Sequence, residues 1–189
     1  MANMKQSTMR SVIRGRSLAG LLLIFSLTCC SDAQKIPATA LPVDLMAFDP
    51  PSIQATGFRS VERAAGQDFR WVLGPRAVLK LYLDAPMRLV LAFKASNPIE
   101  GQDMAVILNG LRVREFTNIP KTDRLTGFKN YEVLLDVQPG PVEIALEFAQ
   151  YNHKSPDDTF APEDKDPLAM TISGLEITQP DHEPRDCPR

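Results

Sequence analysis

The stretch AVLKLYLDAPMRLVLAFK, residues 77–94, decides the fold class of this chain. Every second residue is apolar in two successive runs, 77–84 and 87–94, and a turn-forming segment at 84–86 separates them. A repeat of two residues is typical of an antiparallel strand that buries one of its faces. We therefore predict two neighbouring strands here.

Turn signals divide the rest of the chain into further strands. Asn109-Gly110 lies between the runs 103–108 and 111–116, and this dipeptide favours a tight hairpin turn because both of its residues tolerate positive φ. The sequence QPGP at 138–141 predicts a second turn. Other runs with a strand pattern lie at 53–59, 69–73, 131–137, 142–149 and 168–178.

These patterns predict an all-β fold, because no stretch carries an apolar stripe with helical spacing. We expect an antiparallel two-sheet β-sandwich of jelly-roll type with about nine strands. Its core should contain the apolar face of each strong strand. These residues are Leu79, Leu81, Leu89, Leu91, Phe93, Val133, Leu135, Ile144, Leu146 and Phe148.

The N-terminus has the pattern of a signal peptide, which we assign to residues 1–29. Basic residues, among them Lys5 and Arg16, precede the apolar stretch Leu18–Thr28. A membrane-spanning helix needs about twenty apolar residues, and this stretch is shorter.

The end of this leader, Leu27-Thr28-Cys29-Cys30, resembles the lipobox of bacterial lipoproteins, although Cys29 stands where a smaller residue is usual. The resemblance implies lipidation of Cys30 with acyl chains such as palmitate, and a membrane anchor in the cell envelope. Ser31 after the lipidated cysteine favours the periplasmic face of the outer membrane over the inner membrane, and Asp32 weakens that preference. The alternative is cleavage after Ala33, which would give a secreted soluble protein.

Charge and cysteine content restrict the partners. Removing the leader leaves 17 of the 21 basic residues and all 23 acidic ones, so the mature chain is acidic. This balance argues against a nucleic-acid partner and against electrostatic binding to anionic lipids, since both need basic patches. Cys187 has no partner for a disulfide once Cys30 is lipidated, and we expect it to be dispensable for folding.

The mature chain divides into three parts. Residues 30–44 are small, polar and proline-containing, which predicts a lipid-anchored flexible tether. Residues 45–179 form the predicted sandwich domain. Residues 180–189 are rich in proline and charge and predict a disordered tail.

The predicted domain contains four short motifs: Gly57-Phe58, Phe69-Arg70-Trp71 leading into 77–81, Tyr151-Asn152, and 166–170. Together they resemble a jelly-roll accessory domain found in some bacterial membrane glycosyltransferases. The likeness departs before Pro167, where Asp166 replaces a common arginine. It implies a non-enzymatic β-sandwich, similar to galactose-binding-like and other carbohydrate-binding modules, that contacts glycans.

Catalytic and metal-binding signatures are weak. His153 and His182 are the only histidines, and no nucleophile motif such as G-x-S-x-G accompanies them, so we predict that the protein is not an enzyme. The loop 157–166 holds five acidic residues but lacks the spacing of a calcium loop. We interpret it as a solvated connection without a cofactor, with a structural calcium ion as the alternative.

The predicted ligand site lies where the strand ending at Tyr151 and Asn152 meets this acidic loop. Asp157 adds a carboxylate there, and Trp71 or Tyr82 would supply the flat apolar surface that sugar rings contact. Each aromatic residue also has a structural interpretation, and for Trp71 we favour packing in the core.

Two functions remain open at this point. The first is an envelope lipoprotein whose sandwich binds a glycan or a partner protein. The second is a structural or assembly role, in which the domain docks on an envelope enzyme complex without a small ligand.

Overall fold

The described part of the chain contains eleven strands, and every strand pair is antiparallel. The computed structural model describes residues 37–47, 51–64, 66–122, 127–154 and 160–180, all of which belong to one of two compact units, residues 34–189. These residues contain no helix that is long and apolar enough to cross a membrane.

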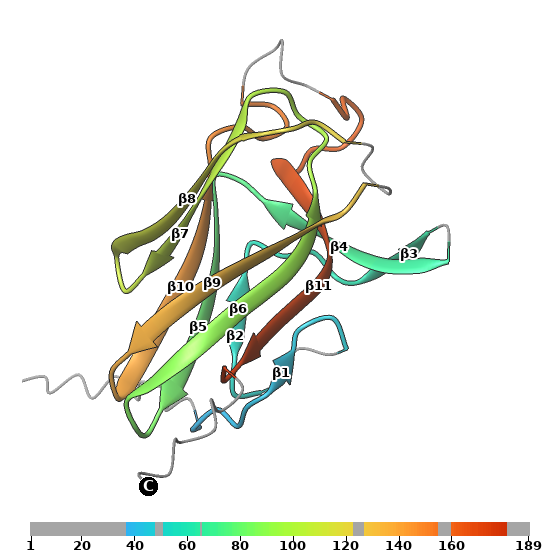
Figure 1. Ribbon diagram of the computed structural model, residues 1–189. Coiled ribbons are helices and arrows are strands. Elements are labelled where there is room, and N and C mark those ends of the chain that lie inside the picture. The colour runs from blue at the N-terminus through green and yellow to red at the C-terminus, as the bar shows by residue number, and fades with distance from the viewer. Residues whose placement is uncertain (1–36, 48–50, 65, 123–126, 155–159, 181–189) are drawn as a thin grey trace, which may run out of the picture. The chain divides into compact units, whose positions relative to one another are not determined.

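The strands form two sheets (Figure 1). Sheet A has the order β3-β4-β11-β6-β9, with β1 also paired to β11, and sheet B has the order β2-β5-β10-β7-β8. The strands of sheet A are β1 (Val43–Asp44), β3 (Glu62–Ala64), β4 (Gln67–Leu73), β6 (Met87–Ser96), β9 (Lys129–Val137) and β11 (Leu168–Thr178). Those of sheet B are β2 (Gln54–Thr56), β5 (Arg76–Leu83), β7 (Gln102–Leu108), β8 (Leu111–Ile119) and β10 (Gly140–Phe148).

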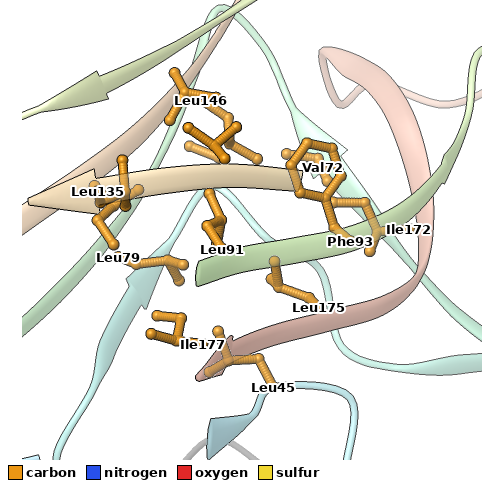
Figure 2. Close-up of a cluster of buried hydrophobic side chains, with 14 of the residues drawn as sticks. Leu45, Val72, Leu79, Leu91, Phe93, Leu135, Leu146, Ile172, Leu175 and Ile177 are labelled. Carbon is orange, nitrogen blue, oxygen red and sulfur yellow. The ribbon is translucent and has the colours of Figure 1, made fainter. Parts of the chain in front are cut away.

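The core lies between the two sheets, where alternate side chains of both meet. In Figure 2, Leu79 and Leu146 of sheet B lie with Leu91, Leu135 and other residues of sheet A in one cluster. All ten predicted core residues are buried. The prediction of an antiparallel two-sheet sandwich of jelly-roll type is therefore confirmed, and so is the assignment of strand faces.

Two strands and one boundary differ from the sequence analysis. We predicted about nine strands, and the two additional ones, β1 and β3, are only two and three residues long. Val43 and Asp44 fall inside the predicted tether 30–44, yet they pair with Ile177 and Glu176 of β11. The folded domain therefore begins before residue 45.

Several connections gather at one end of the sandwich, at the top of Figure 1. The Gly74 N–H donates to the Pro167 carbonyl at 2.7 Å, and the Phe148 N–H donates to the Pro75 carbonyl at 2.9 Å. These two bonds hold the end of β10 and the residue before β11 beside the turn between β4 and β5.

Candidate functional site

The outer side of β4 carries a small apolar cluster of its own. Phe69 and Trp71 point away from the main core and pack with Ala161 and Leu168. Trp71 is only 6% exposed, and its ring stacks on Phe160 with 5.9 Å between centroids. The expectation that Trp71 is buried is confirmed, although it lies beneath a loop and not between the sheets.

Asn152 holds that loop in place. Its side chain is fully buried and its amide nitrogen donates to the carbonyls of Ala161, Asp164 and Asp166 at 3.0, 3.2 and 3.3 Å. Its amide oxygen accepts the Ala161 N–H at 3.2 Å. Both the nitrogen and the oxygen of the amide are thus bound to backbone groups, so Asn152 fixes the conformation of the loop between residues 161 and 166.

Tyr151 occupies the neighbouring position for a simple steric reason. Gly74 lies so close to Tyr151 that a Cβ atom on Gly74 would sit 2.5 Å from the Cβ atom of the tyrosine. The absence of a side chain at Gly74 allows the half-buried Tyr151 to pack against the main core. Tyr151 therefore closes the core at this end of the sandwich.

Arg59 contacts the same loop through two ion pairs. Its Nη1 atom lies 2.8 Å from Asp164 Oδ2, and its Nε atom lies 3.0 Å from Asp166 Oδ2. The Asp166 backbone N–H also donates to Asp164, and this bond, followed by Arg59, lowers the pKa of the Asp164 carboxyl. Asp164 therefore stays ionised in mildly acidic solution.

A buried arginine supports Arg59 from within. Arg70 is 3% exposed and donates from Nε to the Arg59 carbonyl and from Nη1 to the Leu45 carbonyl, both at 2.9 Å. Its guanidinium also lies 5.7 Å from the centre of the Phe58 ring. Arg70 thus fixes the backbone from which Arg59 reaches the loop.

Residues of β4, of the segment 161–168 and of the segment around Arg59 line an open hollow of about 480 Å³, and Asn152, Tyr151 and Arg70 are not part of its lining. Its floor is apolar, with Trp71 at its base, and its walls carry carboxylates, one guanidinium and one ammonium group. The hollow is lined by Arg59, Glu62, Trp71, Ala161, Glu163, Asp164, Lys165, Asp166 and Leu168. We refer to it as the loop hollow. A few fixed polar groups around an apolar floor can orient a polar ligand by hydrogen bonds.

The predicted site residues separate into three groups. Trp71, Tyr151 and Asn152 lie together around the loop, as the sequence suggested. Tyr82 is half-buried and pairs with Pro141 at the other end of β5, roughly 20 Å along the strand from Arg76. Asp157 lies outside the described residues. Whether any of these residues binds a ligand stays a prediction.

Sequence reasoning did not find Arg59. Its partners Asp164 and Asp166 follow more than a hundred positions later, since Arg59 and Asp164 are 105 residues apart. A surface arginine before a short strand carries no local signal for such a contact.

The described residues offer few candidates for metal ligands or catalytic groups. No group of three or more histidine, cysteine, aspartate or glutamate side chains there could hold a metal ion, and Asp157 and Asp158 lie outside that part. The ring of His153 donates from Nε2 to the Asp164 carbonyl, which gives this histidine a role in holding the loop. His182, Cys30 and Cys187 also lie outside the described residues.

Comparisons with known proteins give likenesses among solved structures only. No family model and no curated protein matches the chain. A family 6 carbohydrate-binding module at the C-terminus of a laminarinase from Zobellia galactanivorans is 10% identical, with a TM-score of 0.44, over 74% of this chain and 98% of that one. A family 35 carbohydrate-binding module from Clostridium thermocellum is 13% identical, with a TM-score of 0.43, over 75% of this chain and all of that one, 100%.

Proposed function

We propose that this chain is a non-catalytic binding module of the cell envelope that holds a glycan in the loop hollow. The observation that carries the proposal is the set of ion pairs from Arg59 to Asp164 and Asp166 above the apolar floor at Trp71. These pairs fix carboxylate oxygens in place before a ligand arrives. Preorganised acceptors lower the entropic cost of binding a ligand with many hydroxyl groups.

The burial of Trp71 defines how a sugar would bind. Because Phe160 already stacks on its ring, Trp71 offers apolar surface at the base of the hollow and no open face for stacking. Recognition would then rest mainly on hydrogen bonds that sugar hydroxyls donate to the carboxylates and accept from the ammonium group of Lys165. Such a site should be selective for hydroxyl arrangement and weak in affinity.

We also propose that a lipid on Cys30 attaches the module to the membrane, with the periplasmic face of the outer membrane as its location. The lipobox-like sequence Leu27–Cys30 supports this attachment. The mature chain would carry 17 basic and 23 acidic residues, so attachment to the membrane would rest on the lipid and not on charge.

A glycan array tests the function directly. The full mature chain should bind a restricted set of glycans, and the double variant Asp164→Asn, Asp166→Asn should lose that binding. Glu100→Gln, an exposed change outside the hollow, serves as the matched control and should bind normally. Equal binding by the double variant and the control would rule out the loop hollow as the site.

A further inference from the structure

The open face of sheet A carries a second hollow that the proposed glycan site does not use. We infer that it docks an extended segment of a partner protein that has a basic side chain two positions from an apolar one. This inference goes beyond the proposed function and does not depend on it. It names a surface for the docking role that the sequence analysis left open.

The register of three neighbouring strands creates this face groove. β11, β6 and β9 run side by side (Figure 1), and their pairing places Glu176, Ala92 and Glu132 in one row across the sheet. The next row contains Gly174, Lys94 and Asn130. Ala92 has a small side chain, so the floor between the two glutamates is low, and Gly174 in the next row adds no side chain beside Lys94. The groove measures about 290 Å³.

Two glutamates, Glu132 and Glu176, and one lysine, Lys94, line the face groove, so its net charge is negative and favours a cation at the glutamate row. Glu132 and Glu176 are both exposed, and neither forms a salt bridge with another residue in the described part of the chain. Their Cα atoms are two strand spacings apart, about 10 Å. A guanidinium or ammonium group above Ala92 lies within reach of both carboxylates, and a guanidinium can donate to both at once.

An apolar row adjoins the acidic one and defines the second anchor. Two residues farther along β6, Val90 pairs with Thr178 on one side and Leu134 on the other. Leu134 is 57% exposed and is one of four exposed large apolar side chains among the described residues. Binding of a partner's apolar side chain would remove this surface from water.

The spacing of the two rows matches an extended peptide. Side chains on the same face of an extended chain are two residues apart, about 6.8 Å, and the rows at Ala92 and Val90 are also two residues apart on β6. A segment that lies along β6 can therefore place a basic side chain between the glutamates and an apolar one against Leu134. A simple amine would use only the first of these contacts, which is why we assign a protein segment.

Two short peptides test the inference. The first, acetyl-Gly-Arg-Ser-Leu-Gly-amide, carries the predicted pattern, and the second replaces its arginine by citrulline, which has nearly the same shape and no charge. In NMR titrations of the full mature chain, we expect the arginine peptide to shift the amide signals of Ala92, Glu132 and Gly174. The citrulline peptide should bind roughly fivefold more weakly, since exposed ion pairs contribute only a few-fold each.

Variants separate the contacts of the face groove from effects on folding. Glu132→Gln with Glu176→Gln should weaken the arginine peptide roughly fivefold, whereas Glu100→Gln should leave it unchanged. Ala92→Leu fills the groove at an outward-facing position and should abolish binding of both peptides without lowering the melting temperature by more than a few degrees. Equal affinity of the two peptides, or amide shifts elsewhere in the chain, would overturn the inference, and so would the absence of any shift at millimolar peptide.

Discussion

Replacing Asn152 by alanine should release the loop that forms the hollow while the sandwich itself stays folded. The asparagine amide makes three hydrogen bonds to loop carbonyls and accepts one from the Ala161 N–H. Asn152→Ala removes all four hydrogen bonds. Because residue 152 is fully buried, the backbone groups that it bound lose these partners away from water. The sheets do not depend on these bonds, because the core lies on the other side of β4.

The magnitude follows from the number and length of these bonds. A hydrogen bond within a protein contributes a net 0.5–1.5 kcal/mol, roughly, and an unsatisfied buried group costs about 1–3 kcal/mol. Two of the four bonds measure 3.2 Å and one measures 3.3 Å, so their contributions belong at the low end. We expect a loss of about 2–4 kcal/mol in the free energy of unfolding, less than the roughly 5–15 kcal/mol of a typical domain.

Urea denaturation and amide hydrogen exchange measure the two consequences separately. Urea should show the lower stability with a cooperative transition, and exchange should speed up at Ala161 and Asp164 while Leu91 stays protected. Gln102→Ala, which removes the bonds between Gln102 and Gln150, serves as a control that leaves the Asn152 contacts intact. A loss below about 0.5 kcal/mol with unchanged exchange at Ala161 would refute the role assigned to Asn152.

The remaining predictions concern the core, the anchor and pH. Leu91→Ala should lower the free energy of unfolding by about 2–5 kcal/mol in urea titrations, whereas Leu134→Ala, at an exposed position, should change it by less than about 0.5 kcal/mol; equal effects would mean that the strand faces are misassigned. The mature protein should partition into detergent and carry acyl chains by mass spectrometry, and Cys30→Ser should abolish both; a processed wild-type chain without lipid would contradict the lipobox assignment. The pKa of Asp164 is lowered in the folded chain, first by the Asp166 N–H. Its ionised form therefore contributes stability above its usual pKa of 3.8 and loses that contribution as pH falls through the lower folded value. Asp164→Asn should make stability less dependent on pH in this acid range, and an unchanged pH profile would show that the carboxylate is not stabilised by folding.

The strong strands were predictable because each buries a single face. In β5 and β6, water on one side and the core on the other impose the two-residue repeat that the sequence shows. The Asn109-Gly110 turn was predictable for a local reason, and both residues have positive φ, 48° and 82°. In contrast, β3 has no buried residue among those described, so no apolar pattern marks it.

The candidate site was predictable only in part. The sequence placed Tyr151, Asn152 and the acidic loop together because they are neighbours in the chain. It could not show that Asn152 would direct its amide into the loop backbone, because that depends on the path of residues 160–166. Arg59 and Tyr82 illustrate the same limit, since residue type suggests what a side chain can bind and tertiary structure decides which side chains meet.

A saccharide titration followed by NMR tests the central proposal most directly. The ligand would be the glycan that binds best on the array, added to the full mature chain. The account predicts shifts at the Trp71 indole, at the Arg59 side chain and at the amides of residues 160–168, with no change at the Tyr82 end of β5. Binding of that glycan with shifts confined to other parts of the sandwich would contradict it.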